Sequence, residues 1–407
     1  MQIIADLHIH SRFSRATSRD ITVNNLERWA RIKGLSVLGT ADFTHPKWFS
    51  ELKENLVEEE GILRTKTNFP FILETEISLM FKQKEKMRRI HLLVLAPSFE
   101  VVEQINDYLR KKGRLDYDGR PTFGLTACEF VEAMKEISDA IEIIPAHIWT
   151  PWYGLLGSKS GFDSFEEAFE DQVKKIYAFE TGLSSDPAMN WRVSFLDNYT
   201  ILSFSDSHSL WPWRLGREAT IFELKELSYK NMVKAIRTRE GYKGTIEVEP
   251  AYGKYHFDGH RFCNFSCKPK EAIEKYNNIC PVCKKPLTIG VLHRVEELAD
   301  RPEGFKPKNA FEFKTILPLH EIIAKVLNTV LSSKRVWNEY EKLVNAFNNE
   351  FNVLLEVPFE KLRKVTKEKI ALAIIKNREG KIKIKPGFDG KYGEIILEQE
   401  KQKLLPF

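Results

Sequence analysis

The chain has 407 residues and carries 62 Lys or Arg residues against 57 Asp or Glu residues, a formal net charge of +5. This length suits two or three domains with a substantial core, and so small a net charge means that any affinity for nucleic acid must come from local basic patches. No apolar run approaches the roughly eighteen residues of a membrane span, and no cationic, apolar leader precedes Asp6, so we expect a soluble cytoplasmic protein with no membrane partner.

The first half of the chain alternates short apolar runs with helical patterns. Apolar runs lead up to Asp6, Thr40, Glu76, His147 and Asp206. The helical patterns cover 24–32, 99–111, 126–137, 186–196 and 229–239. Alternation of this kind predicts an α/β sheet or barrel over residues 1 to about 225.

Histidines and acidic residues gather where these apolar runs begin or end. His8 and His10 follow the first run, and residues at i and i+2 of a strand point the same way. Six of the ten histidines lie in the first 208 residues, beside such runs: His8, His10, His45, His91, His147 and His208. Parallel-barrel enzymes place their chemistry at the C-terminal ends of strands. The pattern therefore favours a metal centre over strand-end histidines with ordinary partners.

The ordered set Asp6-x-His8-x-His10, Asp42 with His45, Glu76, His91, His147 and Asp206-x-His208 resembles the polymerase and histidinol phosphatase (PHP) superfamily. The resemblance covers roughly residues 1 to 225. It implies a distorted (β/α)7 barrel that hydrolyses phosphoesters with two or three divalent ions, which would be Zn, Mn, Mg or Fe.

The same resemblance implies a ligand for each ion. One ion would be held by His8, His10, Glu76 and Asp206. Glu76 would bridge to a second ion held by His91 and His147, and a third would use His45 and His208. Glu76, Asp206 and His208 would be the catalytic residues. Where many relatives supply a further ligand after the second histidine, this chain reads Arg12-Phe13-Ser14-Arg15-Ala16.

Four of the five cysteines form one cluster, Cys263-x3-Cys267 and then Cys280-x2-Cys283. Two close pairs at this separation are typical of a structural, tetrahedral zinc site. Lysines and aromatic residues surround the cluster, which suits nucleic acid, although a zinc module can also serve only as a folding staple. We expect three domains: a barrel over residues 1–240, a zinc-binding domain over 241–305 and a basic, mainly helical domain over 306–407.

Aromatic residues next to the proposed ligands are candidates for contact with a DNA base, with the hydrophobic core as the alternative. They are Trp149, Trp152, Tyr153, Trp191 and Trp211. The basic loop 110–121 either touches phosphates or is simply solvated.

The C-terminal region predicts helices over 317–331 and 336–347, a helix that ends near 377–380, and a strand over 381–385. Between residues 361 and 391 there are eleven Lys or Arg residues against three acidic residues, a net +8. A phosphate-contacting arm is our preferred interpretation, with a solvated basic face as the alternative. Its candidate contacts are Lys361, Arg363, Lys364, Lys367 and Lys383.

A PHP barrel joined to a four-cysteine module and a basic helical tail resembles the archaeal endonuclease Q family over essentially the whole length. This resemblance implies a nucleoid-associated DNA repair enzyme that cuts damaged DNA, mainly double-stranded but also single-stranded. It would hydrolyse the phosphodiester on the 5′ side of deaminated bases (uracil, hypoxanthine, xanthine) and abasic sites.

A small-molecule phosphatase, a DNA exonuclease and a non-enzymatic DNA-binding protein remain as alternatives. Whether the terminal residues Gln402 to Phe407 form a partial sliding-clamp peptide is left open by the sequence.

Overall fold

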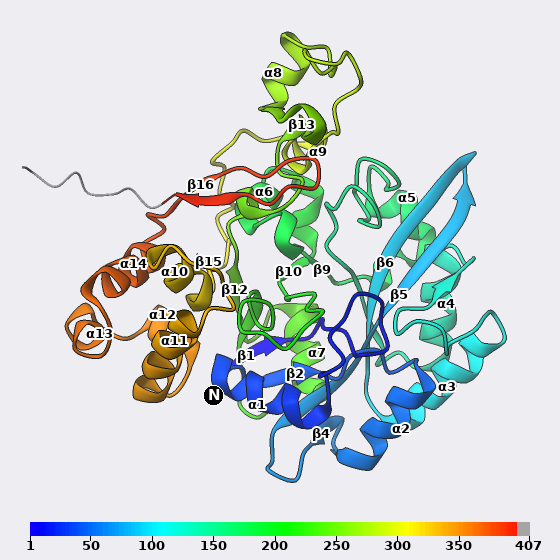
Figure 1. Cartoon of the computed structure of the whole chain (residues 1–407). Helices are drawn as coiled ribbons and strands as arrows, with labels where there is room; N and C mark the ends of the chain where they lie inside the picture. Colours follow the sequence, from blue (N-terminus) through cyan, green and yellow to red (C-terminus); the bar gives the residue numbers. More distant parts are fainter. Residues whose placement is uncertain (397–407) are drawn as a thin grey trace, which may run out of the picture.

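In the computed structural model, which describes residues 1–396, seven strands follow one another around a distorted ring (Figure 1). They are β1 (Gln2–Asp6), β2 (Val37–Gly39), β5 (Pro70–Gln83), β6 (Lys86–Ala96), β8 (Glu142–Pro145), β9 (Ala178–Glu180) and β10 (Thr200–Leu202). Parallel pairs join β1 to β2, β2 to β5 and β9 to β10, whereas β6 runs antiparallel to both β5 and β8.

Hydrogen bonds outside the ladders close the ring. The Ile148 amide donates to the Glu180 carbonyl at 3.1 Å, which joins the end of β8 to β9. On the other side, the Ser203 amide donates to the Thr220 hydroxyl at 3.0 Å, which joins β10 to β11 (Ala219–Glu223). Since β11 pairs antiparallel with β1, the circle is complete. The predicted α/β barrel is thus confirmed.

The reversed direction of β6 is the main difference from a barrel of parallel strands. Gln83 pairs with Lys86, so only Lys84 and Glu85 connect β5 to β6, with φ of +47° and +63°. Two consecutive positive φ angles are typical of the tight turns that suit hairpins. As a result β5 and β6 form one long hairpin, and His91 lies within a strand rather than after one.

Further strands extend the sheet beyond the ring. β12 (Tyr242–Glu247) and β15 (Glu312–Thr315) lie outside β11, and β3 (Val57–Glu59), β4 (Ile62–Arg64) and β7 (Thr122–Phe123) flank β5. The helices around the ring are α1 (Val23–Lys33), α2 (Pro46–Asn55), α3 (Phe99–Arg110), α4 (Ala127–Ile137), α5 (Phe165–Phe169) and α7 (Tyr229–Thr238). The 3₁₀ turns are η1 (Glu170–Lys175), η2 (Gly182–Ser184), η3 (Ser194–Asn198), η4 (Pro250–Tyr252) and η5 (Arg261–Cys263).

Local signals explain the helix ends. The Thr22 side chain accepts a hydrogen bond from the Asn25 amide at the start of α1, which ends at Gly34 with φ of +97°. Thr126 and Glu129 form a reciprocal capping box at the start of α4. The helices expected over 24–32, 99–111, 126–137 and 229–239 are confirmed.

The helix predicted over 186–196 is wrong. α6 (Pro187–Asn190) is a single turn, and η3 follows after a break. The two Nη atoms of Arg192 donate to Glu296 at 2.8 and 2.9 Å, and the Ser194 amide donates to Asp300 at 2.9 Å. These contacts with a distant segment replace the bonds that would continue the helix.

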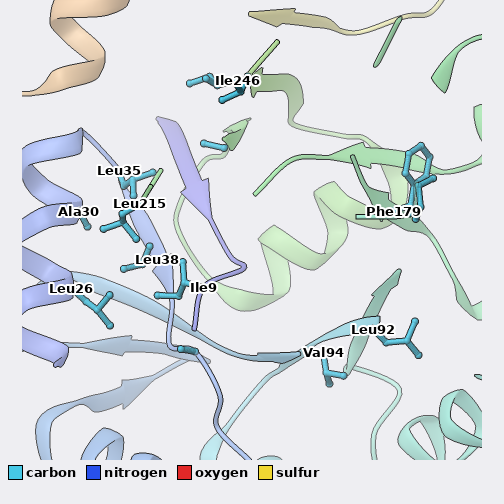
Figure 2. Close-up of a cluster of buried hydrophobic side chains, with 14 of the residues drawn as sticks. Ile9, Leu26, Ala30, Leu35, Leu38, Leu92, Val94, Phe179, Leu215 and Ile246 are labelled. Carbon is cyan, nitrogen blue, oxygen red and sulfur yellow. The ribbon is translucent and has the colours of Figure 1, made fainter. Parts of the chain in front are cut away.

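One buried cluster explains why the two ends of the ring differ. It holds side chains from all seven ring strands and β11, among them Ala5, Ile72 and Leu202, together with Met232 and Ile236 of α7. α7 therefore closes one end of the ring, and polar side chains remain at the other end. A second cluster packs the outer helices on the strands; in Figure 2, Leu26 and Ala30 of α1 lie beside Leu38 of β2.

The cysteine module (residues 254–298) follows β12. It contains β13 (Asp258–His260), β14 (Phe265–Cys267), α8 (Pro269–Glu274) and α9 (Val291–Leu298). The helical domain comprises α10 (Leu319–Val326), α11 (Lys334–Phe347), α12 (Glu350–Leu355), α13 (Phe359–Val365) and α14 (Glu368–Arg378).

After these helices the chain returns to the cysteine module. The hairpin of β16 (Lys383–Lys385) and β17 (Glu394–Ile396) lies beside it, where the Phe257 amide donates to the Gly387 carbonyl at 3.0 Å (Figure 1). The three domain ranges stay a prediction; β12 and β15 lie in the barrel sheet. No described helix is long and apolar enough to cross a membrane. The possible clamp peptide, Gln402 to Phe407, lies outside the described residues.

Candidate metal centre

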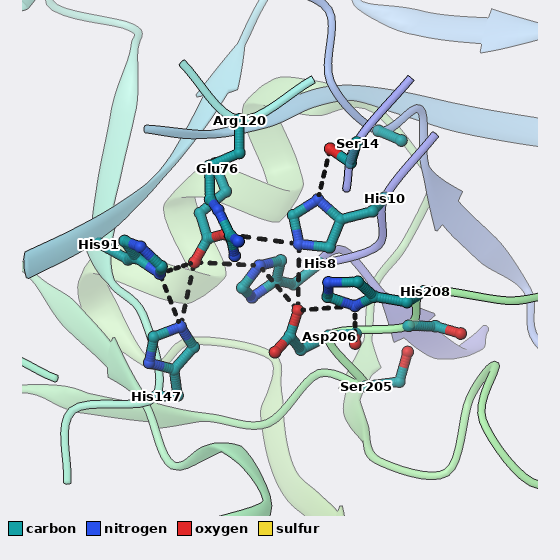
Figure 3. A network of polar contacts seen from close by, with 12 residues as sticks. His8, His10, Ser14, Glu76, His91, Arg120, His147, Ser205, Asp206 and His208 are labelled. Carbon is teal, nitrogen blue, oxygen red and sulfur yellow. Dashed lines mark hydrogen bonds and ion pairs between the residues drawn. The ribbon is translucent and has the colours of Figure 1, made fainter. Parts of the chain in front are cut away.

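Glu76 lies at the centre of a cluster of histidines at the open end of the ring (Figure 3). Its Oε1 is 2.7 Å from His91 Nδ1 and 3.0 Å from His147 Nε2, whereas its Oε2 is 3.4 Å from His10 Nε2. β5 points Glu76 into the ring, and the end of β8 brings His147 to it. Glu76 thus contacts histidines of both proposed ion sites, and its Oε1 is also 3.6 Å from His8 Nε2.

The described residues contain three overlapping groups in this region whose ligand atoms all lie within 4.8 Å of one another. They are His8 with His10 and Glu76, then Glu76 with His91 and His147, and finally His10 with Asp206 and His208. The side chains that the sequence assigns to the first two ions therefore come together around Glu76. Asp206 joins them through His10 Nε2, which is 3.0 Å from Asp206 Oδ1.

The structure corrects the predicted third ligand pair. His45 starts α2 and stacks its ring on Phe13, with centroids 4.3 Å apart, so it belongs to none of the three groups. His208 instead lies with His10, and their ring centroids are 4.4 Å apart. If a third ion is held, His10 and Asp206 replace His45 as partners of His208.

Two carboxylates that are not in these groups fix the histidine rings. Glu180, at the end of β9, lies 2.9 Å from His8 Nδ1 and also accepts the His147 amide at 2.8 Å. Asp42 lies 3.1 Å from His10 Nδ1 and accepts the Ser11 amide at 2.7 Å. Each histidine therefore presents its Nε2 to the centre, which is how metal-binding histidines are commonly held.

Sequence reasoning missed Glu180. It follows the apolar residues Ala178 and Phe179 just as Glu76 follows an apolar run, so the same signal was available. Asp42 belongs to the superfamily pattern, and the structure gives it the role of orienting His10.

Three residues at the metal centre have a strained backbone conformation. Asp42, His147 and Asp206 have φ of +28°, +32° and +46°, values that side chains other than glycine rarely adopt. All three follow strands of the ring, where the chain turns sharply to aim a side chain inward. Strain of this kind persists where the surrounding structure enforces it, and it is concentrated at functional sites.

The donor set fits divalent metal ions. His8 Nε2 is buried and has no hydrogen-bond partner among the described residues, while Glu76 and Asp206 oxygens lie 3.6 and 3.8 Å away. A buried nitrogen without a partner is unfavourable, and a metal ion would supply one. Imidazole and carboxylate ligands together suit Zn, Mn or Fe.

The electrostatics of the cluster separate the histidines into two kinds. Burial alone would lower the pKa of His8, but the Glu180 and Glu76 carboxylates outweigh it and raise that pKa well above 6.5. Burial is opposed in the same way at His10, where Asp42 and Asp206 raise the pKa. For His91 burial prevails and lowers the pKa to about 4. Burial opposes ionisation of Glu76, yet His91 and Arg120 bring its pKa well below the usual value.

The aromatic candidates differ widely in exposure. Tyr153 stacks on His91 with ring centroids 4.3 Å apart, so it borders the centre. Its neighbour Trp152 is 40% exposed, and its ring centroid lies 5.5 Å from that of Tyr255 in the cysteine module. Trp149 is fully buried and donates from Nε1 to Asn190 at 2.7 Å, which favours the hydrophobic core over contact with a base.

Two further tryptophans lie elsewhere. Trp191 is 9% exposed and lines a separate cavity of about 300 Å³ that contains no proposed ligand, so its contact with DNA stays a prediction. Trp211 is 39% exposed and stacks with Trp213 next to Trp337 of the helical domain. The basic candidates lie on the surface: Lys361, Arg363, Lys364, Lys367 and Lys383.

The cysteine module brings four ligand atoms within 4.8 Å of one another, from His260, Cys263, Cys280 and Cys283. This set fits a tetrahedral zinc ion but differs from the predicted four cysteines. Cys267 pairs with Asp258 across the β13–β14 hairpin and is buried in one small cluster with Cys280, and His260 Nδ1 lies 3.4 Å from Cys283 Sγ. His260 is therefore a further candidate ligand, and it takes the place of Cys267 in the group of four whose ligand atoms lie close together.

Comparison with known structures extends these observations to the whole chain. The crystal structure of the lesion-specific endonuclease PfuEndoQ from Pyrococcus furiosus matches with a TM-score of 0.88 and 34% identity, over 99% of this chain and 98% of that chain. The chain belongs to the endonuclease Q family. A structure of endonuclease Q in complex with a 27-mer duplex substrate, with an abasic lesion at the active site, matches with the same TM-score and coverage.

Two curated sequences and one family model are also similar. YqxK of Bacillus subtilis is 28% identical over 97% of this chain and 99% of its own length. MJ0043 of Methanocaldococcus jannaschii is 33% identical over 62% of this chain, and that match spans only 32% of the archaeal protein. Residues 318–381, from α10 to α14, match the family model described as the MJ0043 C-terminal domain. Proteins similar to this chain thus occur in archaea and in bacteria.

Proposed function

We propose that this protein is a metal-dependent DNA repair endonuclease that cuts one strand of a duplex at a damaged nucleotide. The carrying observation is the ligand cluster around Glu76 in a chain that matches, over 99% of its length, an endonuclease Q whose active site holds an abasic lesion. Two or three divalent ions would supply the acidity and charge neutralisation that phosphodiester hydrolysis needs. His8, His10, Glu76, His91, His147, Asp206 and His208 would hold them.

The finer specificity that we propose is cleavage on the 5′ side of uracil, hypoxanthine, xanthine and abasic sites, in duplex DNA and also in single strands. A damaged nucleotide must leave the base stack to reach a buried centre, and extrusion costs least where pairing is weak. Tyr153, which borders the centre, and its exposed neighbour Trp152 would stack against the extruded nucleotide. The exposed cations of α13 and α14 and of the cysteine module would contact phosphates without reading sequence.

End-labelled duplexes that carry one uracil, hypoxanthine, xanthine or abasic site test this specificity. The proposal expects a single nick 5′ of each lesion in the presence of Mn²⁺ or Mg²⁺, and an intact undamaged duplex. Glu76→Ala should abolish the nick while most DNA binding remains. Near-normal cutting by Glu76→Ala would contradict a role for this carboxylate between two ligand groups.

A matched pair of variants tests the role of Trp152 in stacking. Trp152→Ala should slow cleavage of damaged duplex because it removes a stacking surface worth about 1–3 kcal/mol, whereas Trp152→Phe should retain most of the rate. Equal rates for the two variants would remove Trp152 from the proposal.

Each alternative function predicts another product. Progressive shortening from an end would indicate an exonuclease, and turnover of histidinol phosphate without any cut DNA would indicate a small-molecule phosphatase. DNA binding without cleavage under any divalent metal would indicate a non-enzymatic protein. We further propose that the protein acts in the cytoplasm, at the nucleoid. Binding of a sliding clamp by the terminal residues stays an open prediction.

A further inference from the structure

Arg120 is the feature of the metal centre that the proposed function leaves unexplained. It ends the basic loop 110–121, and its Nη1 donates to Glu76 Oε2 at 2.8 Å. Among the described residues, no other Lys or Arg side chain pairs with a proposed ligand carboxylate. Figure 3 shows its guanidinium beside Glu76 and facing His10.

The other cations of this loop behave differently. Arg110 and Arg114 are exposed and pair with Asp107 and Asp116 on the surface. The interpretation of a solvated loop therefore holds for them. Arg120 is only 26% exposed in its side chain and points into the centre. Unlike Arg110 and Arg114, Arg120 therefore lies in the metal centre.

The backbone around Arg120 is fixed from three sides. The Arg120 amide donates to Asp118 at 3.1 Å, the Gly119 amide to the Phe13 carbonyl at 3.1 Å, and the Ser78 amide to the Pro121 carbonyl at 3.0 Å. A Cβ on Gly119 would lie 2.2 Å from Asp42 Oδ2, so no larger residue fits there. These contacts tie the loop to β5 and to the segment after His10, and Arg120 cannot move away as a unit with its loop.

The guanidinium keeps donors for another acceptor. Among the described residues, its one side-chain hydrogen bond runs from Nη1 to Glu76, so Nε and Nη2 keep their donors. A guanidinium presents its N–H groups as a planar fork that matches two oxygens of a phosphate. Glu76 occupies one arm of this fork, and the second arm would be available to a phosphate held by the ligand cluster.

We propose that Arg120 is a catalytic residue that donates hydrogen bonds to a non-bridging oxygen of the scissile phosphate. This inference rests on the proposed function. During hydrolysis a water oxygen bonds to phosphorus, the bond from phosphorus to the leaving sugar oxygen breaks, and that oxygen takes up a proton. Arg120 stays protonated and stabilises the charge that builds on the equatorial oxygens.

Arg120→Gln, Arg120→Lys and the control Arg114→Gln test the inference. Arg114→Gln removes the same charge from the same loop but touches no ligand. Arg120→Gln should lower the single-turnover rate on an abasic duplex by about 10²–10³-fold, the usual effect of losing one such donor. Arg120→Lys should recover part of the rate, and the metal content of all three variants should equal that of the unaltered protein.

A binding measurement separates phosphate contact from support of Glu76. We expect Arg120→Gln to weaken binding of a duplex with a normal scissile phosphate by about tenfold. The loss should be much smaller when that one phosphate is replaced by an uncharged methylphosphonate, which lacks the negative charge and one non-bridging oxygen. Equal losses on both duplexes, or loss of metal from Arg120→Gln, would overturn the inference and leave Arg120 as a support for Glu76.

The two proposals fail in different ways. If the unaltered protein neither cuts nor prefers lesion DNA, the proposed function is wrong. If it cuts and Arg120→Gln cuts within about twofold of the same rate, the function stands and the role of Arg120 is wrong.

Discussion

The carboxylates of Asp42 and Glu180 decide which nitrogen each of two histidines offers to a metal ion. Both hold the Nδ1 side of a ring, so His8 and His10 present Nε2 to the centre. Such supporting groups typically change metal affinity by about 10–100-fold when they are removed. The metal centre therefore includes residues that orient the direct ligands. Glu180 is such a positioning residue.

Glu180→Gln should weaken metal binding by about 10–100-fold. The carboxylate contacts both the His8 ring and the His147 amide, and an amide side chain can accept only one of these two N–H donors without placing its own NH₂ against the other. Calorimetric titration with Mn²⁺ or Zn²⁺ measures the change, with the exposed Glu170→Gln as control. Equal affinities for the two variants would show that Glu180 has no positioning role.

Metal binding should release protons at pH 7. The raised pKa values mean that His8 and His10 are protonated in the metal-free protein, whereas His91, with a pKa of about 4, is already neutral. Because ions bind only neutral imidazole, apparent affinity should rise with pH until the raised pKa values are passed, and fall as the pH drops. Calorimetry in two buffers of different ionisation enthalpy counts the protons. No proton release at pH 7 would contradict this assignment.

The sequence predicts the metal ligands better than the packing of the loops that follow them. Spacing and apolar runs identify His8, His10, Glu76 and Asp206, because strand ends repeat a simple pattern. The same pattern cannot tell that His45 turns toward Phe13, or that Trp149 is buried. Both facts depend on how a loop packs after its strand, which local spacing does not encode.

Among the elements, the β13–β14 hairpin determines the ligands of the cysteine module. Its register puts Cys267 beside Asp258 and leaves His260 near Cys283. Cys280→Ser and His260→Asn should each lose about one zinc per chain and lower the melting temperature, since metal binding is coupled to folding. Cys267→Ser should keep its zinc. Metal analysis and thermal melts check this, and zinc loss from Cys267→Ser with retention in His260→Asn would restore the four-cysteine set.

Element boundaries follow from the sequence where local signals act alone. The cap at Thr126 and the strand predicted over 381–385 are found, the latter as β16. The helix over 186–196 fails because Arg192 and Ser194 bind a segment about a hundred residues away. The reversal of β6 depends on a two-residue turn of Lys84 and Glu85, neither of which is a usual turn residue.

At the scale of the whole molecule, the helical domain is locked to the barrel by a buried ion pair. Lys33 of α1 donates from Nζ to Glu350 of α12 at 2.8 Å and to the Pro212 carbonyl at 2.7 Å, with both charged side chains almost fully buried. Glu350 also accepts from the Tyr340 hydroxyl at 2.8 Å. Breaking such a pair leaves a buried charge unpaired, so the two parts stay together.

The ion pair holds the helical domain on the barrel, and with it the basic surface of α13 and α14. We expect this surface to bind duplex phosphates. Lys361→Gln with Lys364→Gln should weaken binding equally for damaged and undamaged duplex. It should also flatten the plot of log affinity against log salt by about 0.9 per lost phosphate contact. The double variant Lys225→Gln with Lys230→Gln, near the closed end of the ring, is the control. Equal slopes for both double variants would leave the residues 361–391 as a solvated face.

The most direct test of the central claim uses closed circular DNA, because it has no ends for an exonuclease and no phosphomonoester for a phosphatase. One circle carries a single abasic site, and its partner is identical but undamaged. With Mn²⁺ or Mg²⁺ present, we expect the lesion circle to become nicked and relaxed, and the undamaged circle to stay supercoiled. Relaxation of both circles at similar rates, or of neither, would contradict a lesion-specific endonuclease.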